Sequence, residues 1–139
     1  VAMWVLREPY SGLALALAED WARAGFQIIA PGLLLFEISS ALYKRMRRGE
    51  MSLQQAQEAL DVVLGFGVRI EEEAHLQHRA LGLAHRLNRP SAYDAHYLAL
   101  AEFRACEVWT GDERLYNAAR SEFDWVRWVG TSVPTGAEH

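Results

Sequence analysis

The stretch SAYDAHYLALAEFRACEVWTGD, from Ser91 to Asp112, contains the pattern that decides the fold. Its first half has apolar residues at helical spacing, and Ser91 with Asp94 matches a capping box at the start of a helix. Glu107-Val108-Trp109 follows as a short strand, and Thr110-Gly111-Asp112 forms its exit. A helix, a short strand and a turn in this order predict one unit of an alternating α/β chain.

The rest of the chain alternates in the same way between short strands and longer helices. Further strands are predicted at Phe26 to Ala30, Val68 to Ile70 and Trp125 to Val129. Helices are predicted between the strands, over residues 11–25, 31–49, 52–65, 71–87 and 113–120. This alternation indicates βαβ units and a mainly parallel sheet, in which ligands bind beyond the carboxyl ends of the strands.

The size and composition of the chain limit what it can be. It has 139 residues, of which 51% are hydrophobic and 23% charged, so we expect one packed domain over residues 1–129 and a mobile tail over residues 130–139. The net charge of -4 excludes a surface that is basic throughout, so contacts with nucleic acid must be local. No apolar run approaches the roughly 20 residues that cross a bilayer. The single cysteine, Cys106, cannot form an internal disulfide, and we expect a cytoplasmic protein with no membrane role.

Three acids stand at element boundaries on the side of the sheet where ligands are expected: Glu37, Asp94 and Asp112. Each of them also has a purely structural alternative. Glu37 lies in an apolar setting, where backbone amides or an arginine would stabilise its charge as well as a metal ion would. Asp94 and Asp112 would equally serve as helix caps.

Together the three acids predict a metal site, because carboxylates gathered at one end of a sheet repel each other unless a cation compensates. Carboxylate oxygens suit Mg²⁺ or Mn²⁺, which keep several waters and bind substrate phosphates. The predicted chemistry is metal-assisted hydrolysis of a phosphodiester, in which the metal activates water and neutralises the scissile phosphate.

Three segments resemble, in order along the chain, the motifs of PIN-domain ribonucleases. They are Pro31 to Leu42 (PGLLLFEISSAL), Tyr93 to Glu102 (YDAHYLALAE) and Val108 to Leu115 (VWTGDERL). The resemblance is closest to the VapC-type toxins of bacterial toxin–antitoxin modules. It implies a PIN-like three-layer α/β/α fold with a mainly parallel central sheet.

The same resemblance implies roles for individual residues. It places Glu37, Asp94 and Asp112 in the acidic site as catalytic residues and metal ligands, with Mg²⁺ or Mn²⁺ as the cofactor. It gives supporting roles to Thr110 and Ser40. Thr110 would contact a phosphate or a ligand water, or else would only close its turn. Ser40 stands where many family members have an asparagine near the site.

The start of the chain differs from the family pattern. Family members carry an aspartate at the end of the first strand, whereas this chain opens directly on the apolar residues Val1 to Leu6. The segment from Val1 to Glu8 resembles the part that follows this aspartate in the family. We therefore expect the first strand, ending in an Asp-x-Ser-like turn, to lie upstream of Val1.

Candidates for RNA contact lie on two predicted helices. Lys44, Arg45 and Arg48 belong to the densest basic segment, which would hold an RNA backbone or would only complement the negative end of its helix. His96 follows Asp94 closely and is a further candidate.

Three functions remain open at this point. The first is a metal-dependent endoribonuclease toxin that cuts RNA, is neutralised by a cognate antitoxin protein and forms a homodimer, as the resemblance implies. The second is a PIN-like scaffold that has lost catalysis and only binds a partner or RNA, because the first aspartate is missing. The third is a receiver-like Mg²⁺-binding signalling module. Receivers rely on a lysine after a late strand, whereas the only lysine here is Lys44.

Overall fold

The computed structural model describes residues 3–6 and 19–129. Within these residues five strands form one sheet in the order β3-β2-β1-β4-β5, and all four neighbouring pairs are parallel. The strands are β1 (Met3–Leu6), β2 (Gln27–Ala30), β3 (Arg69–Ile70), β4 (Glu107–Thr110) and β5 (Val126–Trp128). The predicted parallel sheet is thus confirmed, and the last four strands lie where the sequence pattern placed them.

The central strand of the sheet is β1. Its Val5 pairs with Ile29 of β2 on one side and with Val108 of β4 on the other. The prediction that the first strand lies upstream of Val1 is therefore wrong. A central parallel strand reads as a near-continuous apolar run, and residues 1–6 form such a run. The prediction was wrong because it relied on the aspartate expected at the end of the first strand and not on the apolar character of residues 1–6.

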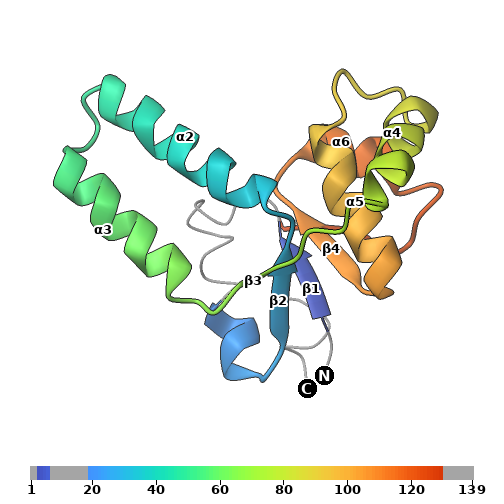
Figure 1. Ribbon diagram of the computed structural model, residues 1–139, viewed down its shortest axis with the longest axis horizontal. Helices are drawn as coiled ribbons and strands as arrows, with labels where there is room; N and C mark the ends of the chain where they lie inside the picture. Colours follow the sequence, from blue (N-terminus) through green and yellow to red (C-terminus); the bar gives the residue numbers. More distant parts are fainter. Residues whose placement is uncertain (1–2, 7–18, 130–139) are drawn as a thin grey trace.

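Helices lie on both sides of the sheet in Figure 1. The helices α2 (Leu33–Arg47) and α3 (Leu53–Leu64) form a hairpin that extends away from the strands. The helix α4 (Leu76–Arg86) packs on α5 (Tyr93–Arg104), and α5 packs on β1 and β4. Buried side chains of α2, α4 and α5 belong to one cluster. The short helix α6 (Glu113–Ala119) packs against β4 and β5.

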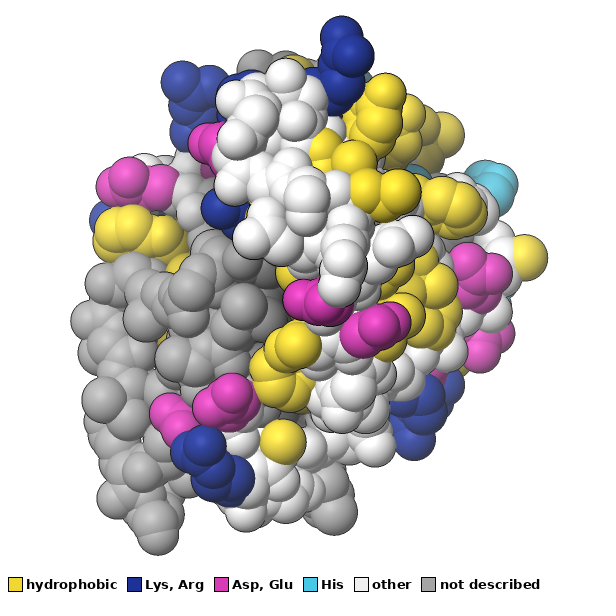
Figure 2. Space-filling model, turned by 90° about the vertical axis from the view of Figure 1, so that its left-hand side faces the viewer, with side chains coloured by type: hydrophobic (Ala, Val, Ile, Leu, Met, Phe, Trp, Pro, Cys, Tyr) yellow, Lys and Arg dark blue, Asp and Glu magenta, His cyan; other side chains and the backbone are white. Residues whose placement is uncertain are grey.

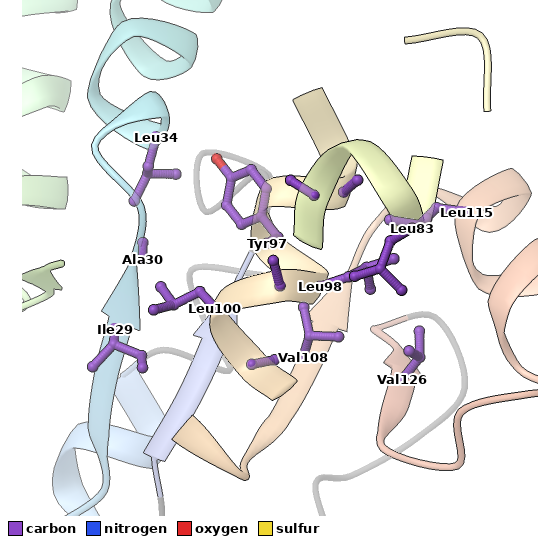
Figure 3. Close-up of a cluster of buried hydrophobic side chains, with 14 of the residues drawn as sticks. Ile29, Ala30, Leu34, Leu83, Tyr97, Leu98, Leu100, Val108, Leu115 and Val126 are labelled. Carbon is purple, nitrogen blue, oxygen red and sulfur yellow. The ribbon is translucent and has the colours of Figure 1, made fainter. Parts of the chain in front are cut away.

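Alternate strand residues enter two separate hydrophobic clusters. Ile29 and Val108 belong to the large cluster that α5 covers, shown in Figure 3. Their neighbours Ile28 and Trp109 belong to a second cluster with Trp21, which comes from the helical residues 19–23. Because successive strand residues point to opposite faces, both faces of the sheet are covered. The predicted three-layer α/β/α arrangement is confirmed.

The helix α5 is the most buried helix in the described part of the chain. Seven of its residues are buried, among them Asp94, Tyr97 and Leu98. The ring of Tyr97 projects from α5 toward Leu34 of α2 in Figure 3. Through Tyr97, α5 therefore contacts α2, and Asp94 lies one turn before this contact.

Local sequence signals differ in how well they predict helix ends. The capping box of Ser52 and Gln55 at the start of α3 is present in both directions, as predicted. Gly25 adopts the left-handed conformation (φ 85°) expected after the first predicted helix, whose start lies outside the described residues. The prediction that Glu71 begins a helix is wrong, because α4 begins only at Leu76.

The acidic run before α4 instead joins neighbouring elements. The backbone N–H of Glu71 donates to Ala30 at the end of β2, and its carboxylate pairs with Arg69 and Arg104. The carboxylate of Glu72 lies so close to Gly32 that a Cβ at residue 32 would be 1.7 Å from Oε1. These contacts hold the run in an extended loop rather than a helix.

The described helices include none with the length and apolar character that would cross a lipid bilayer. One domain over residues 1–129 stays a prediction, and the predicted tail over residues 130–139 lies outside the described part of the chain.

Candidate active site

The candidate site lies at the carboxyl ends of the central strands. The chain passes from β1 to β2 on one side of β1, and later returns to β4 on its other side. Strand order therefore reverses at β1 and β4, which is where open parallel sheets bind ligands. Asp112 follows β4 directly, whereas Asp94 lies on the first turn of α5 and Glu37 on α2.

Asp112 is the N-cap of α6. Its Oδ1 accepts hydrogen bonds from the N–H groups of Arg114 at 3.0 Å and Leu115 at 3.2 Å. The helix-cap role that the sequence left open is thus present. Its Oδ2 points instead toward Arg89, whose Nη2 lies 3.8 Å away. The two oxygens of Asp112 therefore face different neighbours, and capping leaves Oδ2 directed at the site.

Asp94 does not form the predicted capping box. The N-cap of α5 is Ala92, which has no side-chain cap, so the prediction from Ser91 and Asp94 is wrong. Asp94 Oδ2 instead accepts a hydrogen bond of 2.8 Å from Nε of Arg89, and the two side chains are 6% and 11% exposed. The buried carboxylate gains more from a charged partner than from a backbone amide.

The second oxygen of Asp94 has no such partner. Oδ1 is buried and has no hydrogen-bond partner among the described residues. A buried unpaired carboxylate oxygen is costly, and in native proteins such a group usually awaits water or an ion. Its position at the N-terminus of α5 offsets part of this cost through the helix dipole.

Glu37 contacts α5 through a hydrogen bond with Tyr97. Its Oε1 accepts a hydrogen bond from the hydroxyl of Tyr97, which is fully buried on α5. Tyr97 follows Asp94 by three residues, so the two side chains lie on one face of the helix. Glu37 is therefore connected to α5 one turn from Asp94.

The three acids nevertheless do not form the single ligand cluster that the sequence predicts. Among residues 3–6 and 19–129, no three His, Cys, Asp or Glu side chains lie close enough to hold a metal ion together. The compensating cation for Asp94 and Asp112 is the guanidinium of Arg89. Glu37 does not belong to this pair, and its carboxylate accepts a hydrogen bond from the Tyr97 hydroxyl.

The carboxylate oxygens of Asp94 and Asp112 are ligands that suit a hard divalent cation. Asp94 and Asp112 offer carboxylate oxygens, and the buried Oδ1 of Asp94 has no other described partner. In this structure Arg89 balances the charge of Asp94 and Asp112, so a bound cation would lie beside the guanidinium of Arg89 or displace it.

The carboxyl end of β1 is the remaining edge of the site. In the sequence, Arg7 and Glu8 follow Leu6. Neither is the aspartate that the resemblance implies at the end of the first strand. Both residues lie outside the described part of the chain.

The predicted supporting residues occupy different environments. Thr110 is fully buried, and its Oγ1 accepts a hydrogen bond of 3.0 Å from the N–H of Asp112, so it closes the turn. Ser40 is exposed on α2 and lines a surface hollow together with Glu37. His96 uses both ring nitrogens within the fold, at 2.8 Å from the carbonyl of Ala92 and 2.9 Å from Gln77 Oε1.

The predicted RNA-contacting cations line the hollow that contains Glu37 and Ser40. Lys44, Arg45 and Arg48 all border it, on the last turns of α2. Because His96 is engaged in the fold and lines a different hollow, it is separated from this basic group.

Two residues of the site were missed by sequence reasoning. Arg89 was missed because its ion pair with Asp112 joins residues 23 positions apart and leaves no local pattern. A signal that could have found it is an arginine a few residues before an acid at the start of an apolar helix. Tyr97 was missed because its position in an apolar helix indicates core packing. The apolar setting of Glu37 did predict that this acid needs a polar partner.

Comparisons with known proteins agree with this architecture. The family model of the PIN domain matches residues 3–121. No curated protein matches the chain. Among solved structures, the chain is similar to the crystal structure of PAE2754 from Pyrobaculum aerophilum, with a TM-score of 0.76, 20% sequence identity, and coverage of 99% of this chain and 97% of that chain. At this identity the likeness concerns the fold alone.

Proposed function

Because the chain belongs to the PIN domain family, we propose that it is a divalent-metal-dependent endoribonuclease of the VapC toxin type. PIN domains are generally metal-dependent nucleases, and the receiver-like alternative is wrong for a member of this family. The observation that carries the proposal is the convergence of Asp94 and Asp112 on one guanidinium, with Asp94 Oδ1 buried and lacking a described partner.

In this proposal Asp94 and Asp112 hold one divalent ion, Mg²⁺ or Mn²⁺. When bound, the ion supplies positive charge at the scissile phosphate and lowers the pKa of the attacking water. The remaining roles belong to the chain itself. Thr110 fixes the backbone of Asp112 through its hydroxyl, and Tyr97 orients Glu37 so that its carboxylate accepts a hydrogen bond from the attacking water.

Arg89 has two roles in this account. Without a metal ion it balances the charge of Asp94 and Asp112, which would otherwise repel each other. With the substrate bound, its guanidinium lies beside the acids, where the scissile phosphate must approach. Arginine recognises phosphate oxygens through paired N–H groups, so Arg89 would contact a substrate phosphate when Asp94 and Asp112 hold a metal ion.

The partners of the proposed toxin are RNA, a cognate antitoxin protein and a second copy of the chain. The resemblance to VapC-type toxins supports these three partners, together with action in the cytoplasm. The basic group of Lys44, Arg45 and Arg48 beside Glu37 supports the RNA partner, because three cations near one acid favour a polyanion.

The test is cleavage of a circular RNA, which has no ends for an exonuclease. We expect linear products in Mg²⁺ or Mn²⁺ and none in chelator. Cleavage that continues in chelator would contradict the metal-dependent mechanism. The toxin role is tested by expressing the chain without its antitoxin: growth should stop for the wild type and continue for Asp94→Asn.

A second candidate function is a PIN-like scaffold that binds RNA or a partner without cutting. Two observations favour it: Arg7 and Glu8 follow β1 in the sequence in place of an aspartate, and Arg89 already balances the acid pair. Retarded migration of RNA with no product in Mg²⁺, Mn²⁺ or Co²⁺ would select the scaffold over the nuclease.

A further inference from the structure

A hollow of about 610 Å³ lies between the start of α2, the loop before α4 and one face of α5. Leu33, Leu76 and Leu100 form part of its apolar lining. The rings of Phe36 and Tyr93 belong to the same lining, and they are 72% and 62% exposed. Small-molecule sites have volumes of roughly 300–1,000 Å³ and mainly apolar walls, so this hollow has the size and lining of a ligand site.

Three glutamates give the hollow a negative charge. Glu71, Glu72 and Glu73 line it, and no lysine or arginine lines it within the described part of the chain. The charge of Glu71 is balanced by Arg69 and Arg104. Glu72, in contrast, forms no ion pair with any residue that the structure describes. Its charge therefore favours a cation inside the hollow.

The walls of the hollow are held in place without a ligand. Gln77 on α4 and His96 on α5 are hydrogen-bonded to each other at 2.9 Å. The carboxylate of Glu71 joins the loop before α4 to Arg104 on α5. A site with preformed walls loses little conformational entropy when it binds, so more of the contact energy appears as affinity.

The carboxylates and the rings lie at different places along the hollow. Glu72 lies against Gly32, the N-cap of α2, whereas Phe36 follows Gly32 by one helical turn, about 6 Å along the axis. Phe36 and Tyr93 also line the neighbouring hollow that contains Glu37, but none of the three glutamates does. A ligand in the acidic hollow therefore contacts carboxylates at one end and aromatic rings at the other.

The neighbouring hollow has the opposite charge. It is lined by Lys44, Arg45 and Arg48. Figure 2 looks onto the α2–α3 side and shows Lys and Arg side chains at its upper end, with exposed hydrophobic side chains beside them. An organic cation is repelled from the basic hollow and attracted to the acidic one.

We propose that the acidic hollow binds a free aliphatic polyamine. One ammonium group pairs with Glu72 and Glu73, and a second lies over the rings of Phe36 and Tyr93, whose faces attract cations. The hydrocarbon chain between the two ammonium groups covers the apolar wall, from which a metal ion would gain nothing. The inference goes beyond the proposed function, because neither a metal ion nor RNA takes part in this binding.

Calorimetric titration with spermidine in metal-free buffer of low salt tests the site. We expect one molecule to bind per chain, with an affinity that falls as salt is added. Glu72→Gln and Tyr93→Ala should each weaken binding about threefold or more. The matched controls are Glu58→Gln and Tyr43→Ala, since both residues are exposed and neither lines the hollow. Equal losses in the controls would overturn the assignment of the site.

A substitution at Gly32 moves the carboxylate without removing any charge. A Cβ at residue 32 would be 1.7 Å from Oε1 of Glu72, so Gly32→Ala forces this side chain away from its place. We expect binding of spermidine to weaken about threefold or more. Gly82→Ala on α4 is the control, because a Cβ there meets no atom within 4 Å. Wild-type affinity in Gly32→Ala would overturn the pairing of Glu72 with the ligand.

A compact cation separates recognition of a polyamine from attraction to charge alone. Hexaamminecobalt(III) has the same charge as spermidine but no hydrocarbon chain, so it should bind about tenfold more weakly. Equal affinity of the two cations would overturn the polyamine site, since the apolar wall would then contribute nothing.

A second copy of the chain is the other occupant that the test can detect. A protein that sediments as a dimer, becomes monomeric in Tyr93→Ala and binds no spermidine would assign the hollow to that copy and overturn the inference. Saturable binding of spermidine with the expected losses in Glu72→Gln and Tyr93→Ala would support the inference, even if no metal ion produced RNA cleavage.

Discussion

Arg89 donates a hydrogen bond of 2.8 Å from its Nε to Oδ2 of Asp94, and both side chains are almost completely buried. The same guanidinium approaches Asp112 at 3.8 Å. One arginine from the loop before α5 thus occupies the position at which the sequence predicts a metal ion. The consequences for stability and metal binding can be measured.

Arg89→Ala should destabilise the protein in chelator and strengthen its response to metal. Removing one partner of a buried ion pair leaves an uncompensated charge on Asp94, at a cost of roughly 3 kcal/mol in the free energy of unfolding. Added Mn²⁺ should then raise the melting temperature more in Arg89→Ala than in the wild type, because the vacated position accepts the ion.

Arg86→Ala is the matched control for this prediction. Arg86 pairs with Glu122 at 3.0 Å, but the two side chains are 57% and 35% exposed, so the change should alter stability by only about 0.5 kcal/mol. Thermal melts of the three proteins with and without Mn²⁺ give the answer. An identical metal-induced shift in wild type and Arg89→Ala would show that Arg89 and the ion do not share a site.

Tyr97→Phe should lower both stability and activity. The ring remains in the core, but Glu37 loses a hydrogen bond, and bonds to charged groups contribute about 1.5–3 kcal/mol. Chemical denaturation measures the loss. Tyr116→Phe, on α6, serves as the control and should stay within about 0.5 kcal/mol of wild type.

A double-mutant cycle with Glu37→Gln isolates this contact. The coupling free energy between residues 37 and 97 should be at least about 1 kcal/mol. Strict additivity of the two changes would mean that the hydrogen bond does not hold Glu37 in place.

Cys106 should react slowly with alkylating reagents. Burial, followed by the negative charges of Glu71 and Glu107, raises the pKa of its thiol from 9.0 to about 11. Because only the thiolate reacts, the rise of two pH units lowers the reactive fraction at pH 8 about a hundredfold. The rate should increase about tenfold per pH unit until the pH approaches 11.

Glu107→Gln checks the direction of this shift. Removal of a negative charge lowers the pKa of the thiol, so alkylation at pH 8 should become faster. Mass spectrometry gives an unambiguous count of modified protein, since the chain has one cysteine. Wild-type alkylation at the rate of free cysteine would contradict the burial of this thiol.

The sequence predicted the elements whose signals are local. The runs that became β2 and β4 are apolar and bounded by turns, and the capping box of Ser52 and Gln55 needs only residues three positions apart. The same kind of signal failed at Asp94, because a nearby arginine is a stronger partner for a buried carboxylate than a backbone amide. Local pattern cannot rank these two partners.

The candidate site was only partly predictable for a related reason. The three acids were predicted to stand at the ends of elements, which is correct for Asp94 and Asp112 but not for Glu37, since Glu37 lies inside α2. Their mutual distances depend on how α2, α5 and α6 pack. The pairing of Arg89 with Asp112 and of Tyr97 with Glu37, 60 positions apart, exists only in the folded chain. The apolar run of residues 1–6 is typical of a buried strand, but the order of the strands around β1 exists only in the folded sheet.

The most direct test of the account is RNA cleavage by Asp112→Asn. Asparagine is as good an N-cap as aspartate, so α6 should stay intact while the charge that faces Arg89 and the metal is lost. With Asp61→Asn as an exposed acid control on α3, cleavage in Mn²⁺ should fall about a hundredfold or more in Asp112→Asn and stay unchanged in the control. Cleavage by Asp112→Asn at the wild-type rate, with the same dependence on Mn²⁺, would contradict the account.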